Sequence, residues 1–335
     1  MCPTTNVSSV IGIDELVKNN CLTRLFSQSP SPEGLTTALA LHSMMPKDAG
    51  INLLTHGSEA EVLEFLSARP IHSVVMSSFI RDNGLVSDLN RGRFYSYRDR
   101  GGRLEGVALV GHATLFETNS DAALAAFARL VHNSHKVHVI MGEEARVEQF
   151  WRHFTAGGGV PHHVGRELLF ERRGTVLERA GSEPQNTVHG LRLASLEDLS
   201  VVMTTHARMA CEELGLVDPI VADPQGFLER CARRIQQRRV WVLIEDGALV
   251  FKADIVADTP DAVYLEGIYV NPEKRGQGYG LSCLTELSRS LLKHTGSICL
   301  LVNDRNHKAH AFYRRAGFRL QSYYTTIFLR KGSAS

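Results

Sequence analysis

The chain has 335 residues and a mass of 37.1 kDa, a length that predicts two domains rather than one. With 43% hydrophobic and 22% charged residues it has the composition of a globular protein. Its formal net charge of +1 gives no indication of binding to nucleic acid or to an anionic membrane, so we expect neither as a partner.

Six scattered cysteines, without a Cys-x-x-Cys pair, predict reduced thiols rather than a disulfide framework. The chain begins without the basic and apolar stretches of a signal peptide, and no apolar run approaches the roughly 20 residues that span a bilayer. We therefore expect a soluble, cytoplasmic protein. The sequence does not indicate its oligomeric state.

Residues 1–49 predict little beyond a loop at 27–32 and short flanking helices. The segment 50–180 then contains a strand at 93–97, a Gly101-Gly102 turn and a strand at 104–116. A further strand at 137–141 is followed by a helix at 147–154.

The polar stretch 181–188 predicts a linker, after which a similar order of elements returns. A strand at 240–244, an Asp246-Gly247 turn and a strand at 248–255 are followed later by a strand at 298–302 and a helix. From turn to last strand there are 51 residues in this half but 35 in the first. The first half is therefore about 16 residues short.

The segment 265–280 is the most informative part of the chain. An apolar strand reaches a turn at Asn271-Pro272, and a loop with Gly276, Gly278 and Gly280 leads into an amphipathic helix. Glycine-loop amides at a helix N-terminus predict a phosphate-binding site. The nucleotide P-loop pattern fails because no Gly-Lys-Ser/Thr follows, and the dinucleotide pattern fails because residue 281 is leucine.

The spacing Arg275-x-x-Gly278-x-Gly280 resembles the pyrophosphate loop of the GNAT superfamily of acetyl-CoA-dependent N-acetyltransferases. A second signature is similar to the last strand and helix of that family; it consists of Asn303, Asn306, Ala309, Tyr313 and Gly317-Phe318. The resemblance covers residues 188–331 and is closest to the branch of glycine N-acyltransferase-like proteins.

The resemblance implies an α/β fold with a mixed sheet (α+β) and a catalytic GNAT domain at 188–331. Because the first half repeats the element order but lacks an Arg-x-x-Gly-x-Gly run, we expect 50–180 to be a degenerate GNAT-like domain. An unrelated α/β domain is the alternative, since hairpins and strand–helix pairs are generic.

In the resembled family the strand 265–270 splays from its neighbour, which frees backbone N–H groups for the thioester oxygen and the pantetheine arm. The resemblance therefore implies coenzyme contacts from Ile268, Tyr269, Val270, Arg275, Gly276, Gln277, Gly278, Tyr279, Gly280, Leu281, Asn303 and Asn306. For the two asparagines the alternative is that they only cap the ends of a strand and a helix.

Two residues are candidates for acid–base chemistry. Strand alternation places Glu266 on one face with Ile268 and Val270, where a partly buried carboxylate would suit a general base; a solvent-facing glutamate is the alternative. The resemblance implies that Tyr313, seven residues after Asn306 on one helix face, protonates the thiolate. A core aromatic is its alternative role.

The histidines predict no metal site, because neither 132–138 nor 162–163 has partners at zinc-site spacing. The prediction is an acetyl-CoA-dependent N-acetyltransferase acting on a primary amine of a small molecule, peptide or protein. Glu212 and Glu213 could attract such an amine or form a solvated helix face. A non-catalytic acyl-CoA sensor is the alternative from another class.

Overall fold

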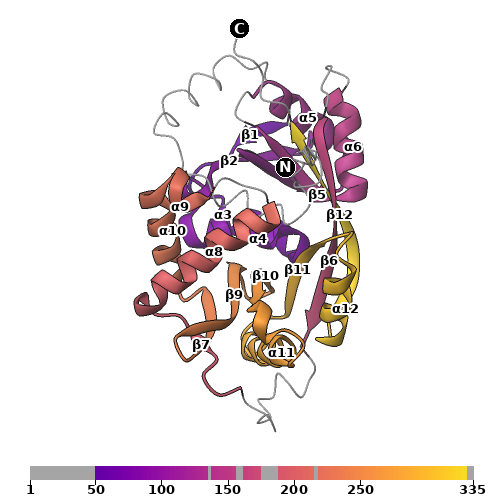
Figure 1. The fold of residues 1–335 in the computed structure, drawn as a ribbon. Helices are drawn as coiled ribbons and strands as arrows, with labels where there is room; N and C mark the ends of the chain where they lie inside the picture. The colour runs from indigo at the N-terminus through magenta and orange to yellow at the C-terminus, as the bar shows by residue number, and fades with distance from the viewer. Residues whose placement is uncertain (1–49, 135–136, 156–160, 175–187, 215–217, 330–335) are drawn as a thin grey trace, which may run out of the picture.

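The computed structural model describes residues 50–134, 137–155, 161–174, 188–214 and 218–329 (Figure 1). The segment 1–49 and almost all of the linker predicted at 181–188 lie outside these residues.

The first half of the chain contains six strands and four helices among its described residues. In chain order they are β1 (Ile51–Leu53), α3 (Glu59–Ser67), α4 (Pro70–Asn83), β2 (Gly92–Arg98), β3 (Leu104–Gly111), β4 (Ala113–Thr118), α5 (Asp121–His132), β5 (Val139–Glu143), α6 (Glu144–Thr155) and β6 (Pro161–Arg173).

The second half follows the same order, with one additional short helix. Its elements are β7 (Arg192–Leu193), α8 (Leu199–Leu214), α9 (Pro219–Ala222), α10 (Pro224–Gln236), β8 (Val240–Glu245), β9 (Ala248–Asp258), β10 (Ala262–Val270), α11 (Tyr279–Leu291), β11 (Ser297–Asn303), α12 (His307–Arg315) and β12 (Arg319–Leu329). The repetition predicted from the turns and strands is thus present in the structure.

All described strands belong to one mixed sheet with the order β1-β2-β3-β4-β5-β12-β6-β11-β10-β9-β8-β7. Most neighbours are antiparallel, but β4–β5 and β10–β11 are parallel. A mixed sheet covered by helices agrees with the predicted α/β class.

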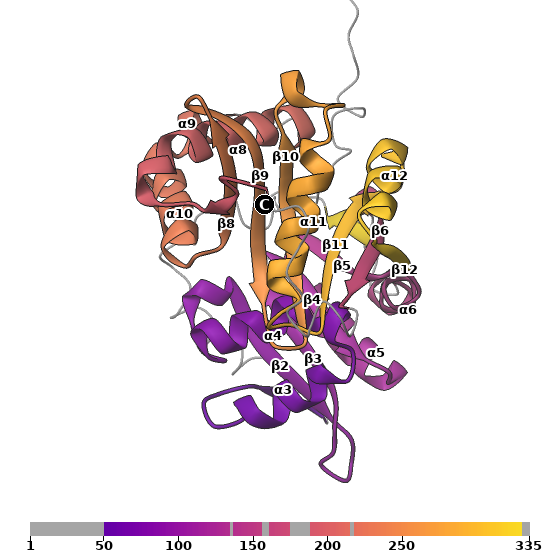
Figure 2. The ribbon, with the colours of Figure 1, turned by 90° about the horizontal axis from the view of Figure 1, so that it is seen from below.

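Helices cover both faces of the sheet (Figures 1 and 2). Leu265 of β10 packs with Leu284 of α11, whereas its neighbour Tyr264 packs with Val74 of α4. We name the two sides the α11 face and the α4 face after these helices. The stripe Leu284, Leu287 and Leu291, spaced for one helix side, is buried on the α11 face.

The two halves exchange their last strands. The C-terminal strand β12 pairs with β5 on one side and with β6 on the other, and β6 pairs with β11 along residues 167–173 (Figure 1). Each half therefore completes its part of the sheet with a strand from the other half.

Candidate active site

The parallel strands β10 and β11 separate where the glycine-rich loop approaches. They pair only at residues 262–264 and 297–299, although β10 continues to Val270 and β11 to Asn303. Beyond Tyr264 the facing backbone groups of the two strands no longer bond to each other, as the resemblance implied. The opening leaves amide N–H groups of β10 available to a ligand.

A cavity of about 710 Å³ occupies this opening, within the usual size range of ligand pockets. It crosses the sheet, because Leu265 and Val302 line it from the α11 face and Glu266 and Leu301 from the α4 face. Its other lining residues are Met209, Gly267, Ile268, Val270, Lys274, Arg275, Gly276, Gly278, Tyr279, Gly280, Leu281, Leu300, Asn303, Asn306, Lys308, Ala309, Phe312, Tyr313 and Arg315.

A β-bulge in β10 alters the predicted side-chain alternation. Between Glu266 and Tyr269 the register with β9 shifts, and Gly267 has a positive φ of 57°. Ile268 and Val270 consequently pack toward the α11 face, on the other side of the sheet from Glu266. The prediction that all three share one face is wrong, because one extra residue reverses a pattern with a period of two.

The loop has the geometry of an anion site. Gly276 and Gly278 have φ angles of 76° and 89°, and a Cβ on either would meet no atom within 4 Å. The first N–H groups of α11 have no partner within the helix, so its N-terminus presents donors and the positive end of its dipole.

Four cationic side chains line the same cavity: Lys274, Arg275, Lys308 and Arg315. Only Arg275 was predicted from the sequence; the other three carry no spacing signal. The Nε of Arg275 also donates to the Val270 carbonyl at 3.1 Å, which ties the loop to the end of β10.

Glu266 is a buried carboxylate at the α4-face end of the cavity, and it is 4% exposed. The Tyr264 hydroxyl donates to its Oε1 over 3.3 Å. Burial raises the pKa of Tyr264 well above its usual value, and Glu266 and Glu167 add to the effect, so Tyr264 remains a donor. The solvent-facing alternative for Glu266 is therefore wrong.

Tyr313 reaches the cavity from α12 and is half-buried. Its ring centroid lies 6.3 Å from that of Phe170 and 6.0 Å from that of Phe318. At the start of the same helix Asn306 lines the cavity, and its Oδ1 accepts the N–H of Ala309 at 3.1 Å. The predicted capping role and a position in the cavity thus coexist in Asn306.

The cavity brings together twelve of the fourteen site residues predicted from the sequence. Tyr269 does not line it, because the bulge turns this side chain to the α4 face, where Arg208 donates to its hydroxyl. Gln277 is also outside the lining, and its Nε2 donates to the Glu273 carbonyl at 2.9 Å. Gly267, whose positive φ makes the bulge, is a site residue that the prediction missed.

The corresponding position in the first half is nearly filled. Strands β4 and β5 pair only at residues 113–114 and 139–140, but just two residues connect β4 to α5, compared with eight between β10 and α11. The Ser120 hydroxyl caps α5 by accepting the N–H of Ala123. The stacked rings of Phe116 and Phe150, whose centroids are 4.8 Å apart, pack beside the split, that is, the place where β4 and β5 stop pairing.

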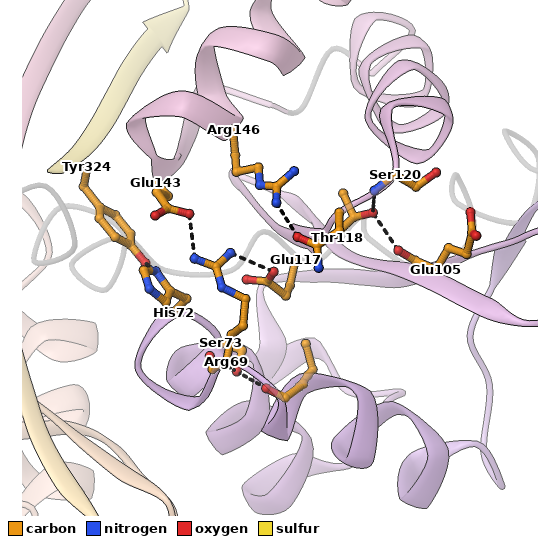
Figure 3. Close-up of polar contacts among 12 residues, drawn as sticks. Arg69, His72, Ser73, Glu105, Glu117, Thr118, Ser120, Glu143, Arg146 and Tyr324 are labelled. Atoms are coloured by element: carbon orange, nitrogen blue, oxygen red, sulfur yellow. Dashed lines mark hydrogen bonds and ion pairs between the residues drawn. The ribbon is translucent and has the colours of Figure 1, made fainter. Parts of the chain in front are cut away.

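Only about 40 Å³ remains in that split, enough for a few water molecules. Arg69 lines this space, and Figure 3 shows it between two carboxylates, with its guanidinium 3.1 Å from Glu117 and 2.6 Å from Glu143. Burial raises the pKa of Glu117, although Arg69 opposes this. Beside them the His72 Nδ1 and the Tyr324 hydroxyl lie 2.9 Å apart.

Residues 236–320 match the family model of an acetyltransferase (GNAT) domain. Within the second half, this segment is a GNAT domain. The match extends from the end of α10 to the start of β12 and includes the glycine-rich loop and the helix that carries Tyr313. None of the curated proteins compared with the chain matches it.

Solved structures of other proteins share the fold of this chain, including that of a tandem GNAT protein. A Drosophila protein aligns with a TM-score of 0.60 over 84% of this chain and 99% of its own, at 13% identity. A GCN5-related N-acetyltransferase from Sphaerobacter thermophilus aligns with a TM-score of 0.54, over 83% and 94%, at 13% identity. A tandem GNAT protein from the clavulanic acid biosynthesis pathway gives 0.51, over 85% and 99%, at 13%. The glycine N-acyltransferase-like branch stays a prediction.

The described residues contain no group of three or more His, Cys, Asp or Glu residues arranged to hold a metal ion. No helix among them has the length and apolar character needed to cross a membrane. The side chains of Glu212 and Glu213, considered for acceptor binding, lie outside the description.

Proposed function

We propose that the chain is an acetyl-CoA-dependent N-acetyltransferase that acts on a primary amine of a small molecule, peptide or protein by direct attack on the thioester. The observation that carries this proposal is the cavity through the sheet. It has an anion-binding loop on one face and the buried carboxylate of Glu266 on the other. An acyl donor and an amine can approach the same point from opposite sides.

The residues present fit a coenzyme with phosphate groups. The N-terminal amides of α11 and the left-handed glycines offer backbone donors, and Lys274, Arg275 and Lys308 add positive charge around the opening. The apolar Leu300 and Val302 line the path between the splayed strands and suit an uncharged arm.

Each catalytic group has a distinct task in this proposal. When the amine forms its bond to the carbonyl carbon, the Ile268 N–H donates to the oxygen that gains charge, which stabilises the transition state by about 3 kcal/mol. Glu266 accepts the proton that the amine must lose, directly or through water. Tyr313 donates a proton to the sulfur as the carbon–sulfur bond breaks.

The test is a thiol-release assay with acetyl-CoA and a panel of amines, amino acids and peptides. The expected result is turnover with at least one acceptor, reduced about 10²-fold in Glu266→Gln, which keeps the shape but not the basicity. Tight coenzyme binding without turnover on any amine would refute the proposed acetyltransferase activity and favour an acyl-CoA sensor.

A further inference from the structure

A buried group of charged residues lies directly behind the bulge of β10. Lys252 and Asp254 of β9 have essentially no exposed surface, and the Lys252 Nζ lies 2.5 Å from the Asp254 Oδ2. Charges this deep in a protein need close partners, because desolvation alone would disfavour them.

Two residues from the helices on the α4 face extend this group. The His206 Nε2 lies 2.8 Å from the Asp254 Oδ2, and an Arg234 guanidinium nitrogen lies 3.8 Å from it. Burial would raise the pKa of Asp254, but Lys252, His206 and Arg234 hold it well below its usual range. Burial also lowers the pKa of His206, although Asp254 opposes this, and the Nε2–H group of the ring donates to Asp254.

Lys252 connects this group to the backbone of the site. Its Nζ donates to the carbonyl oxygen of Gly267 at 3.3 Å. In a planar trans peptide the C=O of one residue and the N–H of the next point in opposite directions. A Gly267 carbonyl held toward Lys252 therefore directs the Ile268 N–H away from the buried group, toward the other side of the strand.

The bulge also fits tightly against the buried group. A Cβ on Gly267 would lie 2.4 Å from the Asp254 Oδ2 and 3.1 Å from the Lys252 Nζ, so no larger residue fits there without displacing them. Gly267 and Ile268 both line the cavity, which places the braced peptide at the reacting centre of the proposed enzyme.

We propose that Lys252 is a positioning residue that fixes the Gly267–Ile268 peptide so that the Ile268 N–H stabilises the charge on the reacting carbonyl oxygen. Asp254, which the Lys252 Nζ and the His206 Nε2 both approach within hydrogen-bond distance, holds the lysine in place. This inference rests on the proposed acetyltransferase function. It assigns a task to a charged cluster that would otherwise be a structural feature of the core.

The first experiment separates positioning from stability by comparing Lys252→Met with Arg234→Met. The second variant alters the same buried group but leaves the hydrogen bond to Gly267. We expect Lys252→Met to lower kcat about 10²-fold or more, while KM and Kd for acetyl-CoA change less than about threefold. Arg234→Met is expected to keep kcat within about threefold of wild type. Equal kcat values in the two folded variants would overturn the proposal.

A second measurement is independent of turnover. In protein labelled with ¹⁵N-isoleucine, the Ile268 amide signal should shift when acetyl-CoA replaces CoA, and this difference should disappear in Lys252→Met but remain in Arg234→Met. An unchanged acetyl-dependent shift in Lys252→Met would refute positioning, even if no amine acceptor were found. If wild type turned over no amine but showed the expected pattern of Ile268 amide shifts, the proposed function would fail and the positioning role of Lys252 would stand.

Should Lys252→Met not fold, Gly267→Ala provides the same test, because its methyl group separates the bulge from the lysine without removing a charge. The expected result is the same fall in kcat with retained coenzyme affinity. Normal kcat in Gly267→Ala would overturn the proposal.

Discussion

Replacement of Gly278 tests the loop most directly, because two variants differ only in charge. Gly278→Glu and Gly278→Gln both place a side chain at φ 89°, where no atom lies within 4 Å of the new Cβ. Both should lose about 1 kcal/mol of stability, since a residue with a Cβ is strained in this left-handed conformation. Their difference in coenzyme affinity then reports the charge alone.

The size of that difference follows from Coulomb's law. At a separation of about 5 Å and an effective dielectric constant of about 20, two like charges repel by about 3 kcal/mol. This corresponds to about 10²-fold weaker binding of acetyl-CoA by Gly278→Glu than by Gly278→Gln. The cations at 274, 275, 308 and 315 keep the neutral variant within about tenfold of wild type.

Isothermal titration calorimetry on the purified variants is the assay, with melting temperatures to verify that both are folded to the same extent. Added salt should narrow the gap between Glu and Gln, because exposed charges are screened. If the two variants bind acetyl-CoA equally, the loop is not the phosphate site.

Three further results are expected. Tyr313→Phe keeps the ring contacts and should lower kcat about 10²-fold with unchanged coenzyme affinity; unchanged turnover would leave Tyr313 a packing residue. Saturating titration should give one coenzyme per chain, because the split in the first half is filled; two equivalent sites would contradict this. Burial and the nearby Arg69 lower the pKa of His72 to about 4, against the opposing effect of Glu143. The unfolded chain takes up this proton near pH 6.5, whereas the folded protein does so only near pH 4. The free energy of unfolding should therefore fall by about 3 kcal/mol as the pH is lowered from 6.5 to 4. His72→Gln should flatten this slope in unfolding measured against pH, and an equally steep slope would show that other groups cause it.

The parts of the site that come from local sequence were predictable. The loop with Gly276 and Gly278 requires left-handed backbone, and the face of α12 with Asn306 and Tyr313 follows from helical spacing. These patterns depend on residues close together in the chain, so their geometry is readable without the rest of the fold.

The remaining features depend on contacts between distant segments. A bulge is a single inserted residue, and Gly267 alone does not distinguish it from a glycine in a regular strand. The buried pairing of Lys252 with Asp254 likewise looks in sequence like one polar face of β9. The sequence does not reveal the exchange of β6 and β12 either, because the residues of a strand do not specify which of several apolar sheet edges it joins.

The exchange also has a consequence during translation. β5 and β6 need β12 between them, yet β12 is synthesised roughly 150 residues after β6. At about 5–20 residues per second this delay is on the order of 10 s. During this delay β5 has one edge without its native neighbour and β6 has two, because β11 is also synthesised late, and such unpaired edges invite association with other chains. The sheet is completed only when the final residues of the chain emerge, so the two halves become native together rather than one after the other.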